Sequence, residues 1–291
     1  MKKLFISLVT LLAAVTALSA NDGIRIKLSG EAASETRKVE KFTKISTSAG
    51  IDVLVTQSNK FNVEVKADKN VIGYVKTEVN NGCLMVGYEK SISITGKGVK
   101  TEVFVTFPAI EALSASSAGD IILQSDISAD NLQLSASSSG DVKAAKFAIN
   151  CKVLEVSASS SGDVKGGVVT CDKFSASASS SGDIIMRVST RQATINASSS
   201  GDVKLGGNAD YCSASASSGS DIVLAKFVCK NVTAKASSGA GIIANVSDSL
   251  EAKASSGADI QYTGNPARID RATSSGGSIK YMKAKAQNDK D

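Results

Sequence analysis

Histidine and tryptophan are both absent from the 291-residue sequence, and phenylalanine and tyrosine together make up only 4% of it. The lack of histidine excludes histidine-based catalytic triads and removes the commonest general base and the commonest zinc ligand. The scarcity of aromatic rings leaves few flat surfaces on which sugars or single-stranded bases stack. These absences argue against histidine-dependent enzymes and zinc proteins.

An excess of charge of one sign is also lacking. The formal net charge is +5, and it falls by two if Lys2 and Lys3 are cleaved off. So small a surplus, spread along the chain, favours solubility and argues against a nucleic-acid partner.

The five cysteines include no C-x-x-C pair, which argues against zinc ribbons and thioredoxin chemistry. Five widely spaced thiols do not make a disulfide scaffold. Cys151 and Cys171 each lie twelve residues before a repeated aspartate, so they are expected to be neighbours. Buried free thiols and a strained disulfide both remain open for this pair.

The N-terminus has the layout of a secretory signal peptide over residues 1–20. Lys2 and Lys3 precede an apolar run, Leu4 to Leu18, which ends in the small residues Ser19 and Ala20. The run is too short and too poorly flanked for a membrane anchor. Cleavage after Ser19 and cleavage after Ala20 both remain open. The mature chain is expected to be exported, in the periplasm or at the cell surface, without stable membrane insertion.

The main feature of the sequence is a repeat resembling S-A-S-S-S-G-D-hydrophobic, which occurs nine times from Ser114 onward. Its last polar position recurs at intervals of 18 to 22 residues, at Asp120, Asp141, Asp163, Asp183, Asp202, Asp221, Gly241, Asp259 and Ser278. A β-branched residue always follows this position. An alanine stands five residues before it in eight copies, and a serine four residues before it in all nine.

This alternation predicts strands with alanine facing inward and serine outward. Strands of like pattern about 20 residues apart predict an all-β fold, a right-handed parallel β-helix of about 19–22 residues per coil. The repeats span residues 111–282. Residues 21–110 are expected to form a β-rich cap with a hairpin turn at Asn80-Asn81-Gly82, and residues 283–291 a disordered tail.

A glycine precedes the aspartate in the first five copies, and from Gly219 it stands one residue earlier. The glycine is expected to supply a positive φ in the turn between strands. Its displacement predicts a change of turn type near Ser220 and a bend in the solenoid.

The order of motifs resembles a known family. F-T-K-I-S-T-S-A-G-I-D-V-L-V-T-Q (42–57) is followed by F-N-V-E-V-K-A-D, V-K-T-E-V-N-N-G-C-L-M-V-G-Y and the repeats. Over residues 39–279 this resembles the bacterial "putative auto-transporter adhesin, head GIN domain" family. The resemblance implies an exported, largely β-helical protein and carries over no catalytic residues.

The repeated aspartates are the main candidate site. Stacked carboxylates repel one another, so each needs a partner. Turn capping, or pairing with Lys143, Lys165 and Lys204, is the structural explanation. A calcium ladder through Asp141, Asp163, Asp183 and Asp202 is the metal alternative.

The sequence therefore favours a non-catalytic binding, adhesion-type or structural envelope protein with no cofactor. It would display flat faces rich in serine, threonine and asparagine to a glycan, envelope or protein partner. The alternative is a carbohydrate-active β-helix enzyme, a polysaccharide lyase or glycoside hydrolase that uses ladder aspartates.

Overall fold

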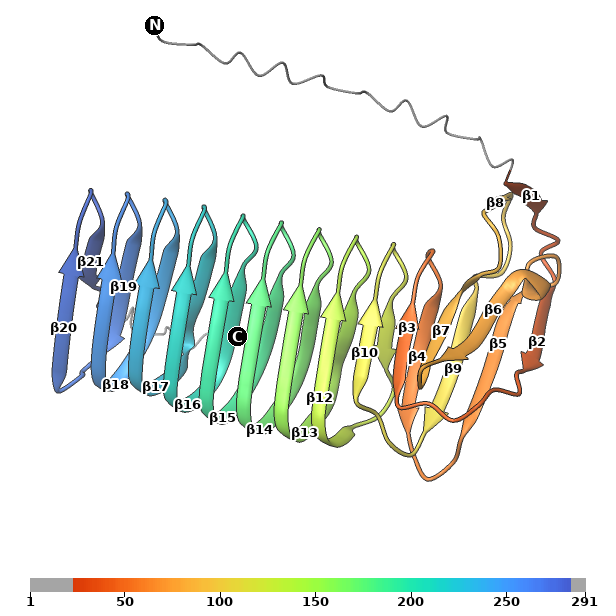
Figure 1. Ribbon diagram of the computed structural model, residues 1–291, viewed down its shortest axis with the longest axis horizontal. Coiled ribbons are helices and arrows are strands. Elements are labelled where there is room, and N and C mark those ends of the chain that lie inside the picture. Colours follow the sequence, from red (N-terminus) through yellow and green to blue (C-terminus); the bar gives the residue numbers. More distant parts are fainter. Residues whose placement is uncertain (1–22, 284–291) are drawn as a thin grey trace, which may run out of the picture.

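The structure, a computed structural model, describes residues 23–283. The expected signal peptide, and all of the expected tail except Lys283, lie outside the described residues. The described chain forms β-strands and a short 3-10 helix, Ile72–Tyr74. Figure 1 shows a long stack of coils with a β-rich lobe at its N-terminal end.

Each coil of the stack pairs in parallel and in register with the next. Val142 lies opposite Val164, Val164 opposite Ile184, and Ala158 opposite Ala178. The parallel β-solenoid expected from the repeat is therefore confirmed. Its strands are β10 (Ala112–Ala115), β11 (Ile121–Leu123), β12 (Ile127–Ala136), β13 (Val142–Ala158), β14 (Val164–Ala178), β15 (Ile184–Ala197), β16 (Val203–Ala216), β17 (Asp221–Ala236), β18 (Gly241–Ala254), β19 (Asp259–Gly264), β20 (Arg268–Thr273) and β21 (Ser278–Tyr281).

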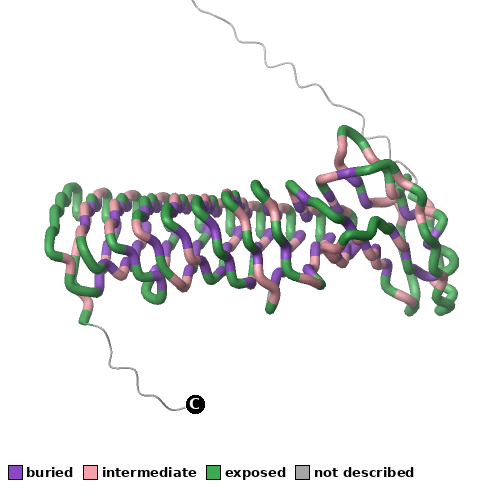
Figure 2. Tube along the Cα trace, turned by 90° about the horizontal axis from the view of Figure 1, so that it is seen from below, coloured by how far each residue is buried: buried purple, intermediate pink, exposed green. Residues whose placement is uncertain are grey.

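Buried and exposed residues alternate along the strands (Figure 2). The repeated alanine is at most 4% exposed in the eight copies from Ala115 to Ala254, which confirms its inward position. Two consecutive exposed residues, Asp172 and Lys173 in β14, interrupt the alternation where the strand bends from one sheet of the coil into the other. Burying a β-branched side chain contributes about 1.5–3 kcal/mol, so the stacked inner columns drive the association of coils.

The parallel stack reaches back beyond residue 111, into the segment expected to be a separate cap. β3 (Lys44–Thr47) pairs with β10, and β4 (Asp52–Gln57) pairs with β11. Thr47 stands opposite Ala115 and Val53 opposite Ile121, so residues 46–53 occupy the positions of a repeat. The next coil outward contains β7 (Cys83–Tyr88) and β9 (Glu102–Phe107).

Antiparallel strands cover this end of the solenoid. β6 (Val75–Asn80) pairs with β7, β5 (Asn62–Asp68) with β9, and β2 (Ala32–Thr36) with β5. β1 (Ile24–Lys27) and β8 (Ile92–Thr95) form a separate two-stranded sheet. Asn81 (φ 50°) and Gly82 (φ 72°) form the turn of the β6–β7 hairpin, as expected. The cover shields strand edges that would otherwise pair with other chains.

The C-terminal end is protected differently. All six residues of β20 are exposed. Arg271 and Thr273 occupy the inward positions that Ala252 and Ala254 hold in the preceding coil. A charge in an inward column disfavours the addition of a further strand at an open edge.

The expectation that the glycine before the aspartate supplies a positive φ is wrong for the first five copies. The left-handed residues there are the two preceding ones, such as Ser138 (φ 49°) and Ser139 (φ 61°). A Cβ on Gly140 would lie 2.6 Å from Ser116 N and 2.7 Å from Gly119 O, backbone atoms of the neighbouring coil. Glycine is required because successive turns approach too closely for a side chain.

From the sixth copy onward the glycine does occupy a left-handed position, as at Gly219 (φ 67°) and Gly239 (φ 70°). The turn keeps two left-handed residues, but the next strand starts one residue earlier in the repeat. β17 starts at the aspartate position itself, whereas β16 starts one residue after Asp202. The predicted change of turn type is therefore wrong, and what changes is the residue at which the strand begins. The predicted bend is wrong, because the coils continue in line past this point (Figure 1).

Candidate functional site: the aspartate ladder and the hydroxyl face

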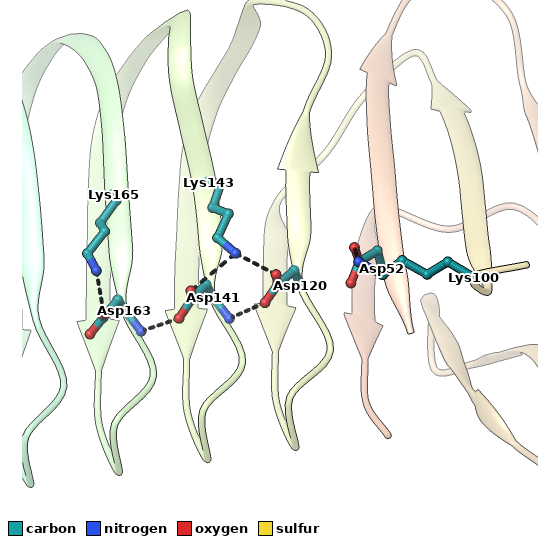
Figure 3. A network of polar contacts seen from close by, with 7 residues as sticks. All are labelled: Asp52, Lys100, Asp120, Asp141, Lys143, Asp163 and Lys165. Carbon is teal, nitrogen blue, oxygen red and sulfur yellow. Dashed lines mark hydrogen bonds and ion pairs between the residues drawn. The ribbon is translucent and has the colours of Figure 1, made fainter. Parts of the chain in front are cut away.

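Six aspartates form a continuous column, here called the aspartate ladder: Asp120, Asp141, Asp163, Asp183, Asp202 and Asp221. In the first five of these coils the carboxylate Oδ1 accepts a hydrogen bond from the backbone N–H of the aspartate in the next coil. From Asp141 onward the successive N···O distances are 3.0, 3.0, 2.9, 3.2 and 2.8 Å. Figure 3 shows the first two of these bonds.

Each of these five carboxylates pairs with a backbone N–H that has no backbone carbonyl as its partner. The carbonyl of Asp163 accepts from the N–H of Val142, at 2.9 Å, while the N–H of Asp163 itself meets the Asp141 side chain. The ladder ends where the strand start shifts. The N–H of Gly241 binds the carbonyl of Ser220 at 3.0 Å, so it needs no carboxylate. A side chain at Gly241 would also collide with Oδ1 of Asp221.

Lysines neutralise one end of the ladder (Figure 3). Lys143 Nζ lies 2.5 Å from Asp120 Oδ2 and 3.3 Å from Asp141 Oδ2, and Lys165 Nζ lies 2.5 Å from Asp163 Oδ2. The expected pairing is therefore confirmed for these two lysines. In the part of the chain that the structure describes, Lys204 forms no ion pair with Asp202.

Asp52 extends the acidic column beyond the residues that the sequence singled out. The register places it opposite Glu102, one coil before Asp120 in the stack, and it forms an ion pair with Lys100. The weak echo of the repeat in S-T-S-A-G-I-D was the only signal for this position, because the turn contains an isoleucine before the aspartate.

Burial and charge act on these groups together. Burial, followed by the carboxylates of Asp163 and Asp202, raises the pKa of Asp183 above its usual value. The hydrogen bond to Asp163 raises the pKa of Lys165. Lys165 lies near enough to Asp183 to offset part of this rise in its pKa.

The calcium alternative finds little support in this geometry. Every carboxylate from Asp120 to Asp202 already has one oxygen bound to a backbone N–H. Among residues 23–283, no group of three or more histidine, cysteine, aspartate or glutamate side chains is arranged to hold a metal ion. The four aspartates considered as calcium ligands form one column with a single carboxylate in each coil: Asp141, Asp163, Asp183 and Asp202.

A second feature, here called the hydroxyl face, covers the outside of the sheet that precedes each turn. It comprises three in-register outward columns of small polar residues. Over the coils of β14, β15 and β16 none of them is charged: Ser175, Ser177, Ser179, Thr194, Asn196, Ser198, Ser213, Ser215 and Ser217. The middle column continues as serine back to Ser46.

One aromatic side chain borders this face. Tyr211 is 56% exposed and lies between Gln192 and Asn231 of the neighbouring coils, beside the bend of the strand. Nothing in the repeat pattern distinguishes it, so sequence reasoning missed it.

Concave surfaces adjoin both ends of the hydroxyl face. A groove of about 810 Å³ near the N-terminal lobe is lined by Ser48, Met85, Tyr88, Ile92 and Ile94, among others. A smaller one of about 390 Å³ near the C-terminal end is lined by the turn serines of β17 and β18 together with Lys235 and Lys253.

Asp68 is a buried carboxylate that the sequence did not reveal. It accepts hydrogen bonds from the backbone N–H groups of Ser29 (3.0 Å), Gly30 (2.8 Å) and Asn70 (3.0 Å), and from the Ser29 hydroxyl (2.9 Å). Burial alone would raise its pKa, but these bonds overcome it and lower the pKa to about 2. Asp68 thereby holds the loop before β2 against β5.

Within residues 23–283, no helix is both long enough and apolar enough to cross a bilayer.

A family model described as "Putative auto-transporter adhesin, head GIN domain" matches residues 41–170 and 166–266. The search of curated proteins returned no match.

Solved structures share the fold. A putative adhesin from Parabacteroides merdae is 18% identical, with a TM-score of 0.68 over 90% of this chain and 100% of that one. A putative lipid binding protein from Parabacteroides distasonis is 20% identical, with a TM-score of 0.66 over 89% of this chain and 99% of that one. At these identities the likeness concerns the fold alone.

Proposed function

Because the chain belongs to the "putative auto-transporter adhesin, head GIN domain" family, we propose that it is an exported, non-catalytic binding protein whose hydroxyl face contacts the ligand. The observation that carries this proposal is the face itself: an in-register, uncharged array of small hydroxyl and amide side chains over three successive coils. Core packing does not require polarity on this side. A regular array of this kind favours an extended partner that offers many weak polar contacts, which add up through multivalency.

The chemistry of the face favours a polyhydroxylated partner, such as an envelope glycan. Hydroxyl and amide groups both donate and accept hydrogen bonds, as sugar hydroxyls do. The exposed ring of Tyr211 at the border offers an apolar surface for stacking. A strongly charged ligand would find no opposite charge in the columns of the hydroxyl face over β14, β15 and β16.

The aspartate ladder supports a structural role and not catalysis. A catalytic acid needs an environment that sets it apart from its neighbours. Here successive carboxylates make the same bond to the next backbone N–H. These acids hold coils together, and the enzyme alternative gains nothing from them.

A second candidate ligand is an amphiphile bound in the N-terminal groove. Met85 (43% exposed) and Ile94 (40% exposed) present apolar surface there, and Lys76 and Lys90 lie beside it. The similar structure described as a putative lipid binding protein makes this groove worth testing.

The test is a binding screen of the mature protein against glycans, envelope fractions and lipid vesicles. A triple variant, Ser177→Lys, Asn196→Lys and Ser215→Lys, places charges in one column of the hydroxyl face. The matched control changes three in-register polar residues before the bend, on the other sheet of the coil: Thr170→Lys, Ser189→Lys and Asn208→Lys.

We expect the first variant to lose binding and the control to keep it. Equal binding by both variants, or no binding of any glycan or envelope fraction by the wild type, would overturn the proposal. Loss of binding in Met85→Glu but not in the hydroxyl-face variant would favour the amphiphile.

A further inference from the structure

Four of the five cysteines fall into two pairs on the inner side of the strand bend. Cys151 of β13 and Cys171 of β14 lie opposite each other, between the registered pairs Asn150–Thr170 and Val153–Lys173. Cys212 and Cys229 approach each other from neighbouring coils although they are not in register, because their registered partners are Val232 and Ala209. Only the first pair could be foreseen from the repeat.

The backbone places Cys151 and Cys171 within reach of a covalent bond. Neighbouring parallel strands lie about 4.8 Å apart, and disulfides join Cα atoms separated by about 4.4–6.8 Å. The two thiols already interact. Their mutual hydrogen bond is the first cause that raises the pKa of Cys151 and lowers that of Cys171. The Thr190 hydroxyl assists in lowering the pKa of Cys171.

Accessibility separates this pair from the other. Cys151 is half-buried, whereas Cys171 is 7% exposed. Cys212 and Cys229 are 4% and 1% exposed, and both are enclosed by the inner columns. Thiol–disulfide exchange requires access to the attacking sulfur, so the two pairs should differ in reactivity.

We propose that Cys151 and Cys171 form an oxidation site, at which a disulfide joins two successive coils when the folded chain meets a disulfide oxidant. One thiolate of the pair attacks a sulfur of the oxidant's disulfide and forms a mixed disulfide, and the first oxidant thiolate leaves. The other thiolate of the pair then attacks the protein sulfur of that mixed disulfide and expels the second oxidant thiolate. Two S–H bonds are lost and one S–S bond is formed, while the oxidant gains two electrons and two protons.

The consequence is a covalent clip between β13 and β14. In the reduced protein only the turn between the two strands connects these coils covalently, and all other contacts between them are non-covalent. A bond here closes a loop of one coil, which restricts the unfolded chain and should raise the unfolding temperature. Cleavage of the clip would return the coils to reversible stacking.

The test starts from the fully reduced, folded protein and uses oxidised glutathione as the probe. After incubation, free thiols are alkylated under denaturing conditions without reductant, and the protein is digested with trypsin. We expect a disulfide-linked pair of peptides, Phe147–Lys152 joined to Gly166–Lys173, and alkylated Cys83, Cys212 and Cys229. The intact mass before alkylation should be lower by two hydrogen atoms.

Two variants act as controls. Cys151→Ser should leave Cys171 alkylated or joined to glutathione, whereas Cys212→Ser should leave the linked peptides unchanged. Alkylation of all five cysteines in the treated wild type would overturn the proposal, as would a link that involves Cys212 and Cys229 alone. A thermal shift between oxidised and reduced wild type that persists in Cys151→Ser would contradict the clip as its cause.

Discussion

Gly182 provides a direct test of why glycine precedes the ladder aspartates. A Cβ at this position would lie 2.5 Å from Ser159 N, 2.6 Å from Ala158 C and 2.8 Å from Gly162 O. All three are backbone atoms of the preceding coil, so no side-chain rotation can relieve the contact. The coils would have to separate by about 1 Å locally to restore ordinary contact distances.

We therefore expect Gly182→Ser to destabilise the protein. Overpacking of a well-packed interior costs about 1–3 kcal/mol. With about 2–4 °C of unfolding midpoint per kcal/mol in domains of 150–250 residues, the expected loss is about 2–12 °C. Thermal unfolding followed by circular dichroism measures it, since the chain has no tryptophan for fluorescence.

The matched control is Gly219→Ser. Gly219 has a φ of 67°, and a Cβ there would meet nothing within 4 Å. Ser200, at the equivalent place in the preceding turn, adopts a φ of 60°. The change should therefore cost about 1 kcal/mol, the low end of the cost of a left-handed residue with a side chain. If Gly182→Ser melts like the wild type, or if Gly219→Ser is the more damaging variant, close approach of the turns is not the reason for the glycine.

Three further predictions concern carboxylates. Asp141→Asn keeps an oxygen acceptor for the next coil and should cost about 1 kcal/mol or less in urea unfolding, whereas Asp141→Ala leaves the part-buried N–H of Asp163 unpaired and should cost about 1–3 kcal/mol. Asp221→Ala should be nearly neutral, because the N–H of Gly241 in the next coil binds the carbonyl of Ser220 and not the Asp221 side chain. The lowered pKa of Asp68, about 2 against 3.8, means that its ionised form favours folding at neutral pH, and this contribution should disappear as the pH falls from about 4 to about 2. Urea unfolding at several pH values checks this, because Asp68→Asn should lack that part of the pH dependence. Calcium should leave the unfolding temperature of EDTA-treated protein unchanged, and a saturable rise that is lost in Asp163→Asn/Asp183→Asn would establish the metal ladder.

Much of the fold could be predicted from the sequence because the information is local. A strand alternates sides every residue, so the positions of alanine, serine and the β-branched residue within one copy decide which side each side chain occupies. Repetition at about 20 residues then requires like strands to stack, and parallel pairing in register follows. Ala178 and Val164 illustrate this, since both are buried in the column that the repeat predicts.

The bonds between coils could be identified only from the tertiary structure, because they depend on how two copies of the repeat approach each other and not on the sequence of either copy. Glycine is required at position 182 because the backbone of the neighbouring coil lies too close for a side chain, whereas at position 219 glycine occupies a left-handed turn. The aspartates look like turn caps within one copy, but their acceptor oxygens serve the next coil. Cys212 and Cys229 meet across a bend although they are not registered partners, and Asp68 binds a loop almost 40 residues earlier in the chain. Periodicity is a property of the sequence alone, whereas the approach of one coil to another is decided by strand register and packing in three dimensions.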